Sequence, residues 1–273
     1  MPFAKANGIE LYYELTDFTR PWEGEAETIL FLHGLHGHQQ WWNWFQTAFF
    51  AQHYRVITLD QRGHGRSFKP ANGYSIENVA EDVHELLLGL GIRRVHLCGA
   101  SMGGMVSLQC ALAYPDMVNS VVLVDSYPHT PTVIQEAIGL WVDDTRARGY
   151  AAVMQTFNDD YADALFSPGF RERCPAFPAF ETQLVLANLM PDEAFIGACQ
   201  AIQRFNVVDR LEQVTAPVLI VTSNEGMAYE ESLAMHERLP HSELWAPEHV
   251  GHSVHVEAPE QFNMRVLRFL KAL

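Results

Sequence analysis

A serine flanked by glycines lies where an apolar run gives way to a helix-like pattern. The segment from Val95 to Met105 reads VHLCGASMGGM, with Ser101 between Gly99 and Gly103. A serine on so sharp a turn has a strained backbone, and the glycines remove side chains that would collide there. Such strain is usually retained for chemistry. The pattern predicts that Ser101 is a nucleophile and that the Met102 N–H faces the negative charge developing before its hydroxyl.

A second loop is predicted to complete an anion site. It follows the apolar run that ends at Leu32 and reads HGLHGH, residues 33–38. Acyl transfer needs two N–H groups converging on one oxygen, and those of Leu35 and Met102 can supply them. We expect His33 to brace this loop through hydrogen bonds. The later segment 60–67, DQRGHGRS, is interpreted as a hydrogen-bonded turn with a structural role.

Thirteen histidines could act as the base that a serine nucleophile needs. We favour His252, since it follows the last apolar run and Gly251 lets the chain bend before it. His249 precedes the bend, and His255 already enters the next helix-like segment. The sequence therefore predicts His252 as the general base.

Two residues are candidates for the acid that orients this histidine. Asp125 ends the apolar run after the nucleophile segment, and Glu225 follows the next such run. Either can reach a histidine at the same edge of a parallel sheet, where it would stabilise the imidazolium. We favour Asp125 and keep Glu225 as the alternative.

The elements that must position these residues form an α/β pattern. With 273 residues and 48% hydrophobic content, the chain can bury one large core. Short apolar runs alternate with helix-like segments, which predicts a mostly parallel twisted sheet flanked by helices. The expected strands are Ile9–Tyr13, Thr28–Leu32, Tyr54–Leu59, Val95–Cys98, Ser120–Val124, Pro217–Thr222 and Glu243–Trp245, with a closing helix at Pro259–Leu270.

An insertion divides this core. Residues 127–209 show helical periodicity, many aromatics and prolines that would split them into short helices, so we interpret them as a helical lid between core segments 1–126 and 210–273. Most of these aromatics are expected to pack the insertion onto the core. A substrate pocket between core and lid is predicted, with these candidate residues: His36, Trp41, Trp42, Met105, Trp141, Met154 and Met190.

Charge and cysteine content exclude several classes of function. The formal charge of −15 and the pI near 5.2 disfavour binding to nucleic acid or anionic membranes. No long uncharged apolar segment is present, so a cytoplasmic protein, monomer or homodimer, with a hydrophobic small-molecule substrate is expected. The four cysteines are expected to be free thiols, with Cys98 and Cys110 buried. A metal at His33, His36 and His38 is disfavoured, and no metal is predicted.

Taken together, these motifs resemble the α/β-hydrolase superfamily over nearly the whole chain. The matching residues are His33-Gly34, the 60–67 turn, Gly99-x-Ser101-x-Gly103-Gly104, and Gly251-His252 before Glu257-x-Pro259-Glu260. The resemblance implies a capped, cofactor-free esterase-like enzyme with Ser101, His252, Leu35 and Met102 in the roles above. The serine argues against the dehalogenases and epoxide hydrolases of this fold, which use aspartate there. The family's usual turn aspartate is replaced near Gly226, which leaves the acid open.

The leading hypothesis is hydrolysis of a carboxylic ester or lactone through an acyl-enzyme. Hydrolysis of a C–C bond would use the same residues. A cofactor-free dioxygenase of an N-heteroaromatic, a function also found on this fold, would use a His252–Asp125 dyad instead. Two further hypotheses for the same fold are a non-catalytic ligand receptor and a hydroxynitrile lyase.

Overall fold

The computed structural model describes residues 2–224, 226 and 228–273, and its described strands form one eight-stranded sheet. The strand order is β1-β2-β4-β3-β5-β6-β7-β8. β1 and β2 pair antiparallel, as do β2 and β4, and all later pairs are parallel. The bounds are β1 Phe3–Ala6, β2 Ile9–Thr16, β3 Thr28–Leu32, β4 Arg55–Leu59, β5 Val95–Ala100, β6 Val118–Val124, β7 Val218–Val221 and β8 Ser242–Trp245.

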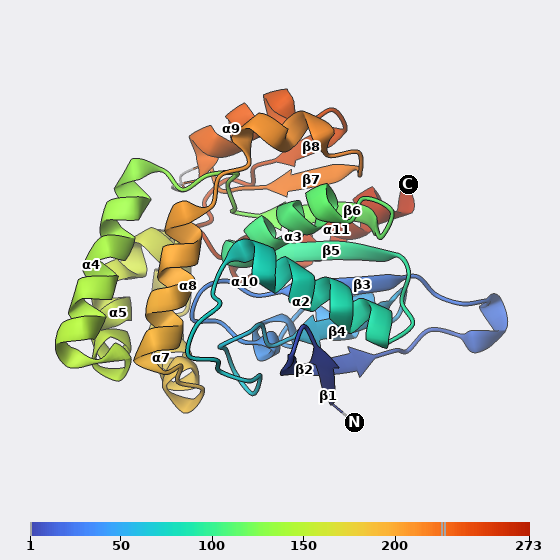
Figure 1. Cartoon of the computed structure of the whole chain (residues 1–273). Coiled ribbons are helices and arrows are strands. Elements are labelled where there is room, and N and C mark those ends of the chain that lie inside the picture. The colour runs from blue at the N-terminus through green and yellow to red at the C-terminus, as the bar shows by residue number, and fades with distance from the viewer. Residues whose placement is uncertain (1, 225, 227) are drawn as a thin grey trace.

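Helices cover both faces of this sheet (Figure 1). α2 (Ile76–Gly89) and α3 (Met102–Ala113) pack together on one face, and α3 contacts β5 and β6. α1 (Thr47–Phe50) and α11 (Pro259–Lys271) share a separate buried cluster on the other face. The remaining core helices are α9 (Tyr229–Arg238) and α10 (Val254–Glu257), with 3₁₀ turns η1 (Pro21–Glu23), η2 (Gln39–Trp42) and η3 (Val208–Gln213). The central strands are therefore buried on both sides, as parallel strands require.

Five helices between β6 and β7 form a group beside the sheet, which we call the helical insertion (Figure 1). They are α4 (Thr132–Arg148), α5 (Tyr150–Leu165), α6 (Pro168–Arg173), α7 (Phe177–Ala187) and α8 (Asp192–Arg204). In Figure 1, α4 and α8 lie beyond the end of the sheet toward which the arrowheads of β7 and β8 point. The insertion thus stands over the carboxyl ends of the parallel strands.

Prolines mark several helix starts in the insertion, as the sequence predicts. Pro131 and Pro191 immediately precede α4 and α8, and Pro168 is the first residue of α6. Proline is favoured at a helix start because its missing N–H would have no helical partner there. The break between α4 and α5 has another cause, since Gly149 adopts φ 84°.

The α/β fold expected from the sequence is confirmed, and Thr28–Leu32 matches β3 residue for residue. The prediction missed β1, because this edge strand of four residues is largely exposed and lacks an apolar run. The four cysteines are free, and Cys98 and Cys110 are buried as expected. Within the part of the chain that is described, no helix combines the length and apolar character needed to cross a membrane.

Candidate active site

The turn at Ser101 joins β5 to α3 with a strained backbone. Ser101 has φ 51° and ψ −116°, a conformation that L-residues rarely adopt. A Cβ on Gly99 would lie 2.1 Å from the Gly103 carbonyl oxygen, and one on Gly103 would lie 2.2 Å from the Leu32 carbonyl oxygen. Neither position therefore accepts a larger residue without moving backbone. This crowding explains why the glycines flank the serine.

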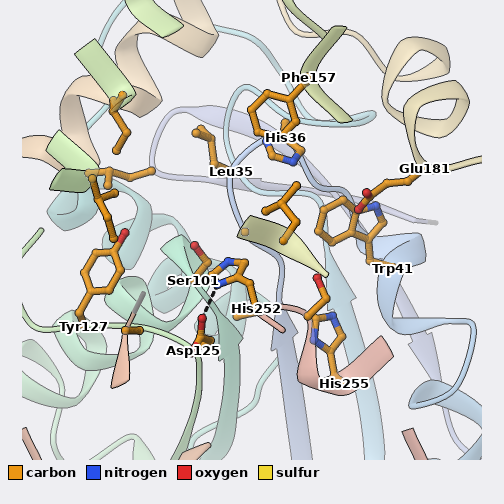
Figure 2. Close-up of a pocket in the computed structure, with 18 of the residues that line it drawn as sticks. Leu35, His36, Trp41, Ser101, Asp125, Tyr127, Phe157, Glu181, His252 and His255 are labelled. Carbon is orange, nitrogen blue, oxygen red and sulfur yellow. Dashed lines mark hydrogen bonds and ion pairs between the residues drawn. The ribbon is translucent and has the colours of Figure 1, made fainter. Parts of the chain in front are cut away.

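Asp125 and His252 meet although they are 127 residues apart in the chain. Asp125 immediately follows β6, has φ 43° and is fully buried, and its Oδ2 accepts a hydrogen bond from His252 Nδ1 (Figure 2). The other oxygen, Oδ1, accepts from Thr222 Oγ1 at 2.9 Å and from the Ser223 N–H at 3.3 Å. Because Nδ1 donates to the carboxylate, the neutral His252 ring leaves Nε2 free to accept a proton.

Opposing influences act on the pKa of His252. Burial lowers this pKa, but the Asp125 charge and hydrogen bond, together with Glu181 and Glu257, raise it above its ordinary value. The imidazolium form is therefore stabilised by nearby carboxyl groups, as a base that accepts a proton during a reaction requires.

Ser101 and His252 line the same cavity, and Figure 2 draws both among its lining residues. No hydrogen bond joins Ser101 Oγ to His252 in the described structure. Such contacts are often long without substrate and tighten when it binds. The arrangement can perform nucleophilic attack with base assistance once the two side chains close this gap.

Two backbone N–H groups beside Ser101 have no protein acceptor among the described residues. They belong to Leu35, in the loop after β3, and to Met102, the first residue of α3; both residues are buried. A Cβ on Gly34 would lie 3.3 Å from Ser101 Cβ, so the Leu35 loop runs directly against the serine. Unpaired N–H groups in this position can stabilise a developing oxyanion.

Hydrogen bonds fix the loops around this site, as expected for His33 and the 60–67 turn. His33 Nε2 accepts from the Gln61 N–H at 3.1 Å, and Gln61 Nε2 donates to the His33 carbonyl at 2.6 Å. Asp60 accepts from the N–H groups of Gln39 at 2.7 Å and Arg66 at 2.8 Å. Burial and His64 lower the pKa of His33 well below its ordinary value, so this ring is a neutral structural element.

A cavity that is partly open to solvent lies between the sheet edge and the helical insertion. Predicted residues Leu35, His36, Trp41, Ser101, Asp125, Trp141 and His252 line it. Lining residues that the sequence reading missed include Tyr127, Ile134, Ile138, Phe157, Glu181, Ile202 and His255. The sequence could have indicated Glu181, because it is the single charged residue in the otherwise uncharged segment of α7, FPAFETQLVLA.

Four predicted pocket residues do not line this cavity. Trp42 is fully buried, with its ring 4.9 Å from that of Phe31 and 4.5 Å from that of His255. Met105, Met154 and Met190 belong to the main hydrophobic core. Apolar residues serve packing as readily as binding, and the sequence does not show which side of an element faces a cavity.

Glu225, the alternative acid, lies outside the described residues. His249 adopts φ 60° and His255 lies in α10, while His252 is the histidine that reaches Asp125. The one cluster of potential metal ligands found among the described residues is Glu81, His84 and Glu85 on α2. None of these three residues lines the cavity.

Several buried titratable groups of the cavity are pushed toward their uncharged forms. Burial raises the pKa of Glu181 to about 8, with His252 opposing the shift. Burial, followed by His252, lowers the pKa of His255 to about 3. Burial, His64 and His252 together lower the pKa of His36 to about 3. At neutral pH these three groups are uncharged, which suits a cavity whose other walls are mainly apolar.

Comparisons with known proteins identify the family of this fold. A family model described as the alpha/beta hydrolase fold matches residues 27–259. A curated protein of Stutzerimonas stutzeri, "Putative carbamate hydrolase RutD", is 30% identical over 269 residues, covering 95% of this chain and 96% of its own length.

Two solved structures are similar over almost the entire chain. The enol-lactonase of Burkholderia xenovorans LB400 has a TM-score of 0.89 at 24% identity, covering 99% of this chain and 100% of that one. At this identity the match shows the fold alone. Est816, described as an N-acyl homoserine lactone degrading enzyme, has a TM-score of 0.82 at 29% identity, covering 98% of this chain and 100% of that one.

Proposed function

This chain belongs to the α/β-hydrolase family and is a hydrolase, and we propose that it cleaves a carboxylic ester or lactone of a hydrophobic small molecule through an acyl-enzyme. The observation that carries this proposal is the joint placement of Ser101, His252 and two unpaired N–H groups beside the same cavity. The likeness to Est816, a lactone-degrading enzyme by its printed description, supports the substrate class.

The proposed reaction follows from the roles these groups can take. His252 Nε2 accepts the Ser101 hydroxyl proton as Oγ attacks the carbonyl carbon, and the Leu35 and Met102 N–H groups hold the oxyanion. Collapse of this intermediate breaks the bond to the leaving oxygen, which takes the proton from His252. Water, deprotonated by His252, then releases the acid and restores the serine. Asp125 keeps the imidazole oriented and stabilises its charged form throughout.

The helical insertion is proposed to act as a lid over this site. Ile134, Trp141, Phe157 and Glu181 all come from it and face the cavity. It therefore completes a largely apolar chamber that limits access of water to the acyl-enzyme.

Carbamate hydrolysis is a second candidate, favoured by the printed name of the 30% identical relative. A carbamate carbonyl would use the same nucleophile and oxyanion donors, so the difference lies in the substrate and not in the residues. Replacing the ester of one substrate by a carbamate with the same leaving group separates the two, because the ratio of their kcat/KM values measures the preference directly.

The proposal is tested with p-nitrophenyl esters from acetate to octanoate and an N-acyl homoserine lactone. We expect turnover by the wild type and a loss of roughly 10⁴-fold or more in Ser101→Ala. Ser253→Ala is the matched control, since this hydroxyl also lines the cavity, and it should retain most of the activity. A fluorophosphonate should label wild type and not Ser101→Ala.

Inert esters and lactones combined with an unlabelled Ser101 would contradict the serine mechanism. Oxygen consumption with an N-heteroaromatic would then identify the alternative His252–Asp125 chemistry. Hydrolysis that survives Ser101→Ala would equally remove Ser101 from the role of nucleophile.

A further inference from the structure

A buried carboxyl group faces the cavity from the helical insertion. Glu181 lies on α7 and is only 5% exposed, although every other residue of this helix is uncharged. Its Oε2 atom is buried and has no hydrogen-bond partner among the described residues. Leaving a buried polar atom unpaired is unfavourable, because the atom has lost its hydrogen bonds to water and gained none in return. A ligand in the cavity that satisfies this atom would recover that free energy.

Other side chains of the same cavity also carry unpaired polar atoms, among them His36 Nδ1 in the loop after β3. Trp41 Nε1 and both ring nitrogens of His255 are buried and lack partners in the part of the chain that the structure describes. They come from η2 and α10, so three separate elements contribute. Figure 2 shows Glu181, Trp41 and His255 on one side of Ser101, with Tyr127 on the opposite side.

Apolar side chains make up other walls of the cavity. They include Ile134 and Ile138 of α4 (Thr132–Arg148) and Ile202 of α8, and Tyr127, five residues before the start of α4, lines it as well. These side chains offer apolar contact. The cavity thus combines apolar walls with a polar arm formed by Glu181, Trp41 and His255.

The proton states of the polar arm define what it can bind. With the pKa of Glu181 raised to about 8 and that of His255 lowered to about 3, both are uncharged at neutral pH. The arm then offers a carboxyl O–H donor with a carbonyl acceptor, an indole N–H donor, and an imidazole with one donor and one acceptor. A charged ligand group would lose its hydration without gaining a counter-ion.

We propose that Glu181, Trp41 and His255 form a subsite that binds an uncharged amide-like group of the substrate, on the side of the scissile carbonyl away from Tyr127. A primary amide is planar and carries two N–H donors and one carbonyl acceptor, which complements this mixed set. An apolar group of the same shape would leave the polar atoms unpaired and be rejected. This inference rests on the proposed function and names the substrate class of the same site.

The test uses pairs of methyl esters that differ at the far end. One member carries a terminal carbamoyl group and the other an isopropyl group of equal shape, each with one to four methylenes to the ester carbonyl. We expect the wild type to prefer the best-fitting carbamoyl ester over its isopropyl partner by about tenfold or more in kcat/KM. Glu181→Leu should reduce that ratio to about one, and Glu181→Gln should preserve more of it because the amide keeps a donor and an acceptor.

Glu172→Leu is the matched control, since this exposed carboxylate lies on neighbouring α6 and does not line the cavity. It should leave the ratio unchanged. Esters ending in an ammonium or a carboxylate complete the series. A preference for either charged ester over the carbamoyl ester would overturn the proposal, as would a ratio that Glu181→Leu does not alter.

Binding to Ser101→Ala separates this proposal from the proposed function. Titration calorimetry with the same ester pair measures affinity without turnover, and tighter binding of the carbamoyl ester that depends on Glu181 supports the subsite even if no ester is hydrolysed. Equal affinity for both esters in Ser101→Ala and in its Glu181→Leu double variant would overturn the subsite while leaving serine hydrolysis intact.

Discussion

The two carboxyl groups that reach the cavity come from different regions and have opposite surroundings. Asp125, at the end of β6, accepts hydrogen bonds from His252, Thr222 and Ser223. Glu181, on α7 of the helical insertion, keeps one oxygen without a partner among the described residues and has a pKa raised to about 8. The difference between Asp125, which accepts three hydrogen bonds, and Glu181, which stays neutral, therefore comes from their surroundings and not from their chemistry.

The comparison extends to the regions themselves. The loops at the sheet edge are fixed by many short hydrogen bonds, such as those made by Asp60 and His33. The insertion is held more by apolar and aromatic packing, for example Phe157 against Trp141 with ring centres 5.1 Å apart. Hydrogen bonds fix atoms to within tenths of an ångström, which chemistry needs, whereas apolar packing tolerates substitution. We therefore expect the sheet edge to determine the reaction and the insertion to determine the substrate.

The largest expected effect is at Asp125. Asp125→Asn should reduce kcat by about 10⁴-fold, because an amide can hold the imidazole in the wrong tautomer. Ester hydrolysis measures this, with Glu225→Gln assayed in parallel. A loss of that size in Glu225→Gln and not in Asp125→Asn would transfer the role of the acid to Glu225.

The next effect concerns stability and the protonation of Glu181. In the folded protein Glu181 keeps its proton up to about pH 8, whereas in the unfolded chain it releases it near 4.5. Between these values the folded state binds more protons, so the free energy of unfolding falls as pH rises. Glutamine does not titrate. As the pH rises from 5 to 9, the free energy of unfolding of Glu181→Gln should therefore increase by on the order of 4 kcal/mol relative to that of the wild type.

Urea unfolding of both proteins at these two pH values gives this difference, and the titrations of groups that do not interact with Glu181 cancel in it. A difference that does not change with pH would mean that Glu181 is already ionised in the folded protein. The contrast with Asp125 would then disappear.

A smaller effect is expected where the two regions are joined. Glu257 is buried, and its carboxylate accepts from the Gly251 N–H at 2.9 Å and from the Ser167 N–H at 3.2 Å, which connects the His252 loop to the insertion. Glu257→Gln turns an N–H₂ group toward these donors and should cost about 2 kcal/mol of stability, roughly 5 °C in Tm.

Thermal unfolding and kcat are measured together for Glu257→Gln. Exposed Glu260 supplies the matched control, Glu260→Gln, for which neither quantity should change appreciably. A lower Tm with full kcat would show that the contact stabilises the insertion without positioning His252.

The smallest effect tests one hydrogen bond to Asp125. Thr222→Val keeps the shape of the side chain and removes the donor 2.9 Å from Oδ1, which should lower kcat by about tenfold. Thr145→Val is the control, because the Thr145 hydroxyl is buried in the insertion and has no partner among the described residues. Equal kcat values for wild type and both variants would show that Asp125 does not depend on this bond.

Features that depend on local chain geometry could be predicted from the sequence. Gly99, Ser101 and Gly103 specify the turn between β5 and α3, because their spacing leaves room for the crossing backbones. The alternation of apolar runs and helical segments likewise predicted the sheet, whose parallel strands must be buried on both faces. These features are decided by neighbours within a few residues.

Contacts between segments that are far apart in the chain became visible only in the tertiary structure. It brought Asp125 to His252 across 127 residues, and it turned Glu181 and His255 toward the cavity while Trp42 and Met105 were directed into the core. Periodicity shows that a helix has a buried face but not whether that face meets side chains or a cavity. The contact between Asp125 and His252 and the placement of Glu181 and His255 at the cavity follow from packing between elements, which local sequence does not encode.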